Sequence, residues 1–279
     1  MATIAKLHDK ARRAIAEVPP PPAPPRKYWT RRGIAEWLIE TLADDTPTLV
    51  GIDHAFSFPR RYFDSYGLNL SWPAFLDDFQ AHWPTDDSDT WVRDVLRGAK
   101  GKGFDRRGDK SCFRITESRT KTAKSVFNFD AKQGCVAFSS HAGIPWLLFI
   151  RRHLGELVHF WPFDGWDIPA GRSAIAEVYP ALWNRSFARA DRTMDQHDAF
   201  CVAAWLFRAD LDGSLAAFLK PDLAPPERAW LGSKDGYWGW RNARCNRNVV
   251  LLTCVQARLG LAAENPDRTG PPSIYATAT

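Results

Sequence analysis

A chain of 279 residues with 45% hydrophobic and 25% charged residues has the composition of a globular protein and is long enough for one large domain. Its formal charge of +5 permits a polyanionic partner without requiring one. No run approaches the roughly 18 apolar residues of a membrane span, no apolar leader opens the sequence, and the five cysteines lack metal-ligand spacing. We therefore expect a cytoplasmic protein with free thiols and no membrane partner.

The first 28 residues are expected to form an N-terminal arm. Ala, Lys and Arg dominate residues 1–17, which favours a short basic helix. The prolines at residues 19–25 then predict an extended and stiff spacer, because proline fixes φ and removes backbone donors. From residue 29 to residue 42 apolar side chains recur at helical spacing, so we expect a helix with Thr30 as its N-cap.

The clearest strand candidate is TLVGID at residues 48–53, a short apolar run that ends in a carboxylate. A helix is expected at residues 72–83. The polar, glycine-containing stretch 86–124 predicts a long loop or lid. Within it, residues 93–124 contain eleven Lys and Arg against four acidic residues. This basic segment is interpreted either as a clamp for the phosphate backbone of nucleic acid or as a solvated loop.

The second half of the sequence alternates between expected strands and helices, which favours an α/β fold. Strands are predicted at residues 158–163 and 174–179, a strand or an entry loop at 134–139, and helices at 144–154 and 195–208. Beyond residue 232 the periodicity decays. Residues 233–279 are therefore predicted to form an irregular tail that is disordered from residue 264.

Four carboxylates occupy positions from which strands and helices direct side chains to one place. Asp53 ends the first strand, and Glu177 lies in the otherwise apolar run AIAEVY. Asp195 and Asp198 lie in the first turns of an apolar helix. An ionised carboxylate in an apolar strand is costly unless it is paired or bound to a metal. Because Mg²⁺ and Mn²⁺ prefer carboxylate and water ligands, the set predicts a metal site.

Three of these carboxylates also have a local structural interpretation. Asp53 is compatible with an Asx turn, which is common at the end of a strand. Asp195 is compatible with the N-cap of the helix 195–208. Asp198 is then compatible with the second half of a capping arrangement, favoured by the helix dipole.

Glu177 has a different alternative, which is an ion pair with a buried arginine such as Arg172 or Arg185. The histidines do not form a spaced zinc motif. His197 lies between two of the candidate aspartates, and we interpret it as a residue on the helix surface rather than as a ligand. The sequence contains no Gly-rich nucleotide-binding motif, so a nucleotide cofactor is not expected.

Four segments resemble, in the same order, the motifs of the DUF429 family of predicted ribonuclease-H-like nucleases. IDHAFSFP at residues 52–59 is similar to the family's acidic strand, an Ile-Asp followed by a short loop to Leu-Pro. SVFNFD at 125–130 is similar to its Ser-Val-Phe segment, and AEVYPALW at 176–183 to its Glu-Val-His-Pro-Glu motif. DQHDAFCVAAWL at 195–206 resembles its closing Asp-rich helix. The resemblance covers approximately residues 29–220.

The resemblance implies a set of metal ligands. Asp53, Glu177 and Asp198 would hold Mg²⁺ or Mn²⁺ and serve as the catalytic residues. Asp195 is a second option on the same helix. His54 and Tyr179 would be near neighbours of the site.

The resemblance also implies a fold, with two departures from the family pattern. We expect a ribonuclease-H-like mixed sheet flanked by helices over residues 29–232, with irregular extensions at both ends. Family members usually open with a strand that carries Gly-x-Asp, but residues 1–28 contain no apolar run that ends in a carboxylate. The second departure is Tyr179-Pro180-Ala181, where the family often has His-Pro-Glu.

Two functions follow from these patterns. The first is a metal-dependent nuclease that hydrolyses phosphodiester bonds and attracts nucleic acid through the basic segment 93–124. The second is a non-catalytic binding or regulatory module, which the missing first acidic strand favours.

Overall fold

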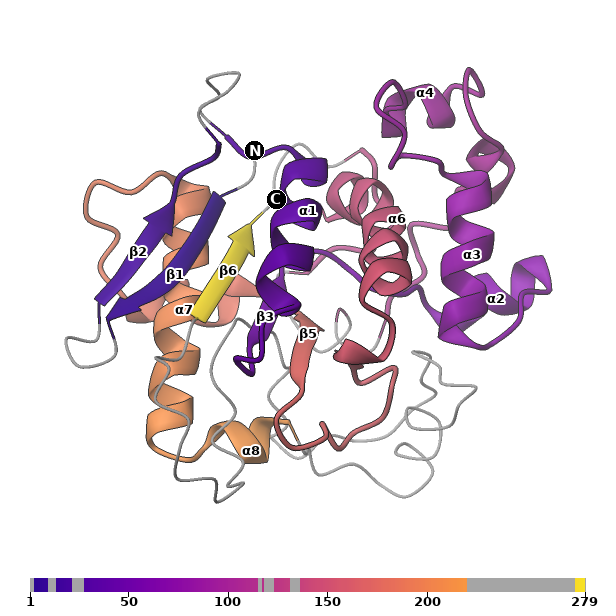
Figure 1. Ribbon diagram of the computed structural model, residues 1–279. Coiled ribbons are helices and arrows are strands. Elements are labelled where there is room, and N and C mark those ends of the chain that lie inside the picture. Colours follow the sequence, from indigo (N-terminus) through magenta and orange to yellow (C-terminus); the bar gives the residue numbers. More distant parts are fainter. Residues whose placement is uncertain are drawn as a thin grey trace, which may run out of the picture. The chain divides into compact units, whose positions relative to one another are not determined.

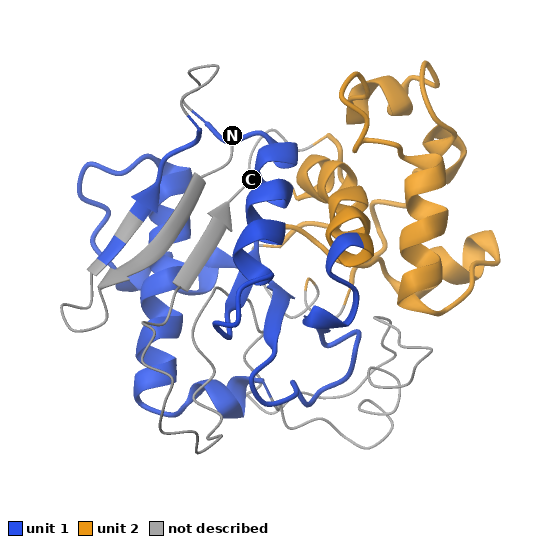
Figure 2. Ribbon diagram, in the orientation of Figure 1, with its two compact units in different colours: residues 1–53, 153–221, 250–279 blue, residues 54–152, 222–249 orange. Residues whose placement is uncertain are grey.

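The computed structural model describes residues 3–9, 14–21, 28–114, 117, 123–130, 136–219 and 274–278. The chain divides into two compact units, coloured blue and orange in Figure 2. Unit 1 comprises residues 1–53, 153–221 and 250–279, and unit 2 comprises residues 54–152 and 222–249. This division differs from the predicted arm, domain and tail, because segments from both ends of the chain belong to the same unit.

The centre of unit 1 is a mixed sheet in the order β2-β1-β6-β3-β5-β4 (Figure 1). Its strands are β1 (Thr3–Asp9), β2 (Ala14–Val18), β3 (Leu49–Ile52), β4 (Val158–Trp161), β5 (Ser173–Glu177) and β6 (Ile274–Ala278). Strands β6, β3, β5 and β4 run parallel to one another, while β1 is antiparallel to both β2 and β6. The predicted mixed α/β architecture is confirmed.

The three strands predicted in the middle of the chain are present as β3, β4 and β5. All residues of β3 and β4 are buried, as are the first four residues of β5. Near-continuous apolar runs are typical of parallel strands, because helices cover both faces of such a sheet. The side chain of Ser173 fixes the start of the β3–β5 pair by accepting a hydrogen bond from the backbone of Thr48 at 3.1 Å.

The predictions for both ends of the chain are wrong where the structure describes them. Residues 3–9 and 14–17 are not helical, because β1 and β2 form an antiparallel pair there. The tail is not irregular throughout, because β6 lies between β1 and β3. Pairing between distant strands outweighs the helix propensity of Ala, Lys and Arg, which is worth only tenths of a kcal/mol per residue, about 0.7 at most. The proline-rich spacer from residue 22 and the tail from 220 to 273 lie outside the described residues.

Helices flank this sheet in two layers. Helix α7 (Met194–Leu211) packs on one face together with the short α8 (Leu215–Phe218), and α1 (Arg31–Leu42) lies in front of the sheet in Figure 1. Small residues of α7, such as Ala199 and Ala203, belong to the same buried apolar cluster as Ala174 and Ala176 of β5. The predicted N-cap of α1 is confirmed, since Thr30 accepts a hydrogen bond from the backbone of Gly33 at 3.0 Å.

Unit 2 is built mainly from helices. They are α2 (Arg60–Tyr66), α3 (Trp72–His82), α4 (Val92–Leu96) and α6 (Ala137–Leu154), together with the 3₁₀ turn η1 (Gly103–Arg106). The predicted helix at 72–83 is confirmed as α3. A strand at residues 134–139 is excluded from residue 137 onwards, where α6 begins. No helix within the described ranges is long and apolar enough to cross a membrane.

An aromatic core surrounds His141 of α6 in unit 2. Its ring centroid lies 4.5–4.9 Å from those of Phe58, Trp83 and Phe129. The ring N–H at Nδ1 donates to the carbonyl of Ala137, and burial lowers the pKa of His141 to about 3. This histidine is therefore neutral at physiological pH and serves as a core residue.

Pro145 lies inside α6, one turn after His141. Proline has no N–H, so the carbonyl of His141 lacks its usual helical donor. The hydroxyl of Thr85 replaces that donor with a hydrogen bond of 2.8 Å. A buried carbonyl needs such a partner, and the bond ties the segment after α3 to α6.

Candidate functional site

Two of the predicted carboxylates lie at the ends of neighbouring parallel strands in unit 1. Asp53 follows β3 directly, and Glu177 is the last residue of β5. The register pairs Ile52 with Glu177, and the backbone N–H of Val178 donates to the carbonyl of Ile52 at 2.9 Å. Because the carboxyl ends of parallel strands meet at one edge of a sheet, this edge is where α/β proteins place their sites.

The hydrogen bonds at the start of α7 show that neither Asp195 nor Asp198 caps this helix. Thr193 is the N-cap, and its hydroxyl accepts a hydrogen bond from the backbone of Gln196 at 3.3 Å. The side chain of Gln196 in turn accepts from the backbone of Thr193 at 2.8 Å, which completes a capping box. The predicted N-cap role of Asp195 is therefore wrong, and Asp198 has no part in the cap.

The pKa of Asp53 responds to the charges of the three other carboxylates. Burial raises the pKa of Asp53 well above its ordinary value, and the negative charges of Asp198, Glu177 and Asp195 raise it further, in that order. The three other carboxylates therefore lie within electrostatic range of the buried Asp53. They come from β5 and from the first turns of α7.

Asp198 is held by a residue that the sequence analysis did not select. The side-chain amide of Asn184 donates to Asp198 at 3.2 Å. Burial raises the pKa of Asp198, while this hydrogen bond and the nearby His197 lower it and Asp195 raises it. Asn184 begins the 3₁₀ turn η4 (Asn184–Ser186), shortly after the AEVYPALW segment. A polar residue just after that segment was the available signal.

His197 is buried, so its interpretation as a surface residue is wrong. Its Nε2–H donates to the carbonyl of Asn184 at 2.8 Å, which holds η4 against α7. Cys201 lies one turn further along, with Sγ 3.4 Å from Nε2 of His197. Burial raises the pKa of Cys201 to about 11, so the thiol stays protonated and this pair lacks the thiolate that a nucleophile requires.

The two arginines suggested as buried partners of Glu177 are not fully buried. Arg185 is exposed and Arg172 is partly buried. Among the described residues, no three His, Cys, Asp or Glu side chains lie in an arrangement that holds a metal ion. The carboxylates around Asp53 are close enough to interact through charge, and joint coordination would require them to move closer.

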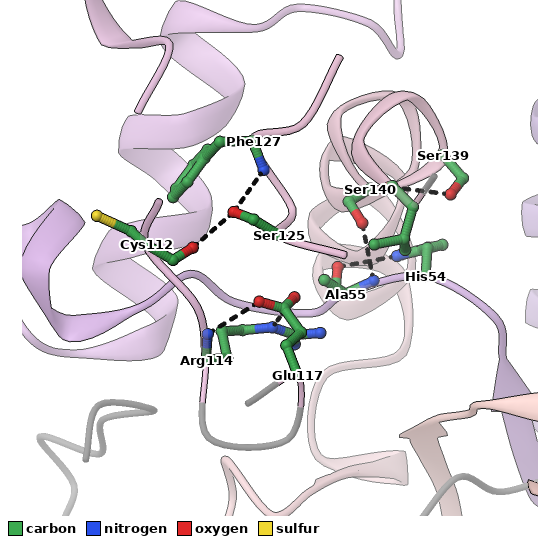
Figure 3. A network of polar contacts seen from close by, with 10 residues as sticks. His54, Ala55, Cys112, Arg114, Glu117, Ser125, Phe127, Ser139 and Ser140 are labelled. Carbon is green, nitrogen blue, oxygen red and sulfur yellow. Dashed lines mark hydrogen bonds and ion pairs between the residues drawn. The ribbon is translucent and has the colours of Figure 1, made fainter. Parts of the chain in front are cut away.

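The family resemblance implies that His54 and Tyr179 are neighbours of the site. Tyr179 lies just after β5 in unit 1 and is partly exposed. His54 belongs to unit 2, where its Nδ1–H donates to the carbonyl of Ala55 at 3.0 Å and its ring lies against Gly143 of α6. The backbone of Ala55 donates to the hydroxyl of Ser140 at 2.9 Å, as Figure 3 shows.

The basic segment 93–124 contains cations of two kinds. Arg114 is buried and forms an ion pair with Glu117, with Nε and Oε1 2.9 Å apart and each side chain 4% exposed (Figure 3). Arg106 is mostly buried and pairs with Asp78. These two arginines stabilise unit 2. The other described cations of the segment are exposed: Arg93, Arg97, Lys100, Lys102, Arg107, Lys110 and Lys124.

No protein-family model, curated protein or solved structure shows significant similarity to the chain.

Proposed function

We propose that the protein is a divalent-metal-dependent nuclease that hydrolyses phosphodiester bonds. The observation that carries this proposal is the grouping of Asp198, Glu177 and Asp195 around the desolvated carboxylate of Asp53. Like charges brought together at low dielectric are unfavourable, so a fold retains them mainly where a cation or a proton is used.

The donor set suits Mg²⁺ or Mn²⁺, because carboxylate and amide oxygens are the ligands that hard divalent cations prefer. Asp53, Glu177 and Asp198 would hold the metal, and Asp195 would be a further ligand from the same helix. When bound, such an ion lowers the pKa of water and stabilises the leaving oxygen of a phosphodiester.

The protein's own groups would prepare this site in three ways. Asn184 orients the carboxylate of Asp198 through its 3.2 Å hydrogen bond. The capping box of Thr193 and Gln196 fixes the helix start that carries Asp195. Burial of Asp53 keeps bulk water away from its carboxylate, so a bound cation would interact with it at low dielectric.

The resemblance to the DUF429 family supports the same proposal. It implies a ribonuclease-H-like mixed sheet flanked by helices, and unit 1 has a mixed sheet of that general kind. It also selects the same carboxylates that act on Asp53. One feature departs from the family pattern, since the sheet position beside β3 is filled by β6, whose sequence IYATA contains no carboxylate.

The test is cleavage of generic RNA, DNA and hybrid substrates with Mn²⁺, and of the small diester bis(p-nitrophenyl) phosphate. Wild type should cleave, and Asp53→Asn should lose at least about 100-fold in rate, as expected when a central catalytic carboxylate is neutralised. Asp191→Asn is a matched control, because Asp191 is an exposed aspartate shortly before α7. Equal rates for wild type and Asp53→Asn would exclude the assigned mechanism.

A second candidate function is a non-catalytic binding module of the same fold. It is favoured by the absence of a carboxylate in β6 and by the spacing of the carboxylates, no three of which within the described residues hold an ion as they stand. Calorimetric titration with Mn²⁺ near neutral pH separates the two functions. Binding that Asp53→Asn abolishes supports the nuclease, and no binding by wild type supports the module.

A further inference from the structure

A small lobe of unit 2 combines exposed cations with exposed aromatic rings. We call residues 91–107 the basic lobe; it contains α4 and η1. Arg107 at the end of η1 donates to the carbonyl of Leu96 at the end of α4, which joins the two elements. The lobe is therefore a folded part of the segment that the sequence predicted to be a long loop.

The lobe is attached closely to the end of α3. The backbone of Lys102 donates to the carbonyl of His82 at 2.9 Å. Gly101 has a φ of +63°, and a Cβ added there would lie 2.6 Å from the same carbonyl. A Cβ added at Gly103 would lie 2.3 Å from the ring of the buried Trp83. Only glycine allows this approach, so the surface of the lobe is presented on a fixed support.

The charge of the lobe is positive and largely accessible. It contains six cations and two acidic residues. Arg106 forms an ion pair with Asp78. The remaining cations are exposed: Arg93, Arg97, Lys100, Lys102 and Arg107. The acidic residues just before the lobe are partly engaged, since Asp86 accepts from Gln80 and Asp87 accepts from Thr90.

Two large aromatic side chains of the lobe face solvent. Trp91 is 69% exposed and Phe104 is 47% exposed, although rings of this size are usually buried. The guanidinium of Arg107 lies 4.1 Å from the centroid of the Phe104 ring, so a planar cation extends this aromatic surface. Exposed rings among cations are what a protein uses to stack unpaired bases while it holds the phosphate backbone.

We propose that the basic lobe binds single-stranded nucleic acid, with Trp91 and Phe104 stacking on unpaired bases and Arg93, Arg97 and Lys102 contacting phosphates. A duplex offers the same phosphates, but its bases are stacked and not available to these rings. The inference rests on the proposed function only in that it assigns unpaired nucleotides as the substrate class. Binding itself requires no metal.

The experiment measures binding of the full chain to fluorescein-labelled oligonucleotides by fluorescence anisotropy in EDTA. The probes are a 20-nucleotide uridine RNA, a 20-nucleotide thymidine DNA and a duplex of the same length. Wild type should bind the single strands more tightly than the duplex. Comparison of the two single strands shows whether RNA or DNA is preferred.

Variants of the lobe separate stacking from charge. Trp91→Ala should weaken binding to the single strands about tenfold, and Trp91→Phe should restore most of the loss. Arg93→Gln combined with Arg97→Gln should reduce the slope of log affinity against log salt by about 1.4, since each phosphate contact on a single strand contributes about 0.7. Because these side chains are exposed, their replacement should leave the thermal melt unchanged.

Matched controls lie outside the lobe. Leu157→Ala removes an apolar side chain that is 60% exposed, and Arg152→Gln removes a cation whose side chain is 61% exposed. Neither should change binding. Equal affinity of wild type and Trp91→Ala for the single strands would overturn the inference. Equal affinity of wild type for the duplex, or no binding to any probe, would overturn it as well.

A separate readout distinguishes failure of this inference from failure of the proposed function. Cleavage of bis(p-nitrophenyl) phosphate needs the carboxylates but no extended nucleic acid. Trp91→Ala should leave that cleavage unchanged, whereas Asp53→Asn should abolish it. Metal-dependent cleavage of the small diester without binding to single strands would exclude the lobe proposal and leave the hydrolase standing.

Discussion

Carboxylates occur in two contrasting environments in this protein. In unit 2, Glu117 is buried beside Arg114, which donates to it from both its backbone and its side chain at 2.9 Å. In unit 1, the principal charges that act on the pKa of Asp53 are three other carboxylates, and all of them raise it. The first environment compensates negative charge, and the second concentrates it.

Under the proposed function, the first environment contributes stability and the second belongs to the site. Compensation of a buried charge is what folding free energy favours. Concentration of like charge lowers stability in the absence of a cation, so it is expected at a site that uses the charge. The comparison leads to opposite effects of mutations in the two regions.

The largest effect is expected from Arg114→Met, which leaves Glu117 buried without its arginine. Removal of one partner of a buried ion pair costs about 3–5 kcal/mol, and the urea midpoint should fall accordingly. The double variant Arg114→Met with Glu117→Leu should recover most of this loss, because no isolated charge remains. Lys110→Met, at the exposed pair with Asp130, is the control and should leave the midpoint unchanged. A similar loss in Arg114→Met and Lys110→Met would break the comparison.

The next effect is stabilisation by metal. If Asp53, Glu177 and Asp198 hold Mn²⁺, an ion concentration 100 times the Kd should stabilise wild type by about 2.7 kcal/mol and raise its melting temperature by several degrees. Differential scanning calorimetry measures this shift. Asp53→Asn should show no shift, while Arg114→Met should retain it at its lower melting temperature. A shift that persists in Asp53→Asn would mean that the ion binds elsewhere.

Asp53→Asn should also stabilise the metal-free protein at neutral pH, by about 0.5–2 kcal/mol. The folded-state pKa of Asp53 is raised, so the folded state holds this proton more tightly than the unfolded state does. The carboxylate therefore lowers stability as pH rises from the unfolded pKa, about 3.9, through the folded pKa. The difference in unfolding free energy between the variant and wild type should vanish below this window and reach its full value above it.

Urea denaturation of both proteins across that pH range, in EDTA, measures the difference. Glu117→Gln is the contrasting variant, since it should destabilise at neutral pH where Asp53→Asn stabilises. Destabilisation by Asp53→Asn at pH 7 would indicate that the carboxylate is compensated in the folded state, as Glu117 is.

The smallest effect concerns the start of α7. Thr193→Ala removes the side-chain cap and should cost about 1 kcal/mol. Asp195→Asn should cost less, because Asp195 is not the N-cap and keeps only a favourable position near the helix dipole. Thermal denaturation of the two variants measures both losses. A smaller loss in Asp195→Asn shows that Asp195 contributes little to the stability of the helix. A larger loss in Asp195→Asn than in Thr193→Ala would restore the capping interpretation.

Much of the middle of the chain could be predicted because its signals are local. The helical period from residue 29 to 42 and the cap at Thr30 depend on neighbours a few positions away, and α1 matches both. The apolar runs that became β3, β4 and β5 mark burial on both faces of a parallel sheet. The rule that parallel strands share an edge at their carboxyl ends predicted that Asp53 and Glu177 would lie at neighbouring strand ends, and the β3–β5 register agrees.

The failures have a common physical cause, which is that the deciding partners are distant in sequence. β1 was expected to be part of a helix, but it pairs with β6 from the opposite end of the chain. His197 looked like a surface residue because its acceptor, the carbonyl of Asn184, lies in a separate turn. The cap of α7 was misassigned because Thr193, two residues earlier, offers the reciprocal bonds with Gln196 that Asp195 does not.

The sequence by itself determined where most helices and strands in the middle of the chain form, since periodicity, caps and apolar runs act over a few residues. Tertiary structure alone decided which strands pair, which arginines form ion pairs, and how strongly other carboxylates act on Asp53. Those outcomes depend on distances between remote segments and on the loss of water around them, and no local pattern encodes either quantity.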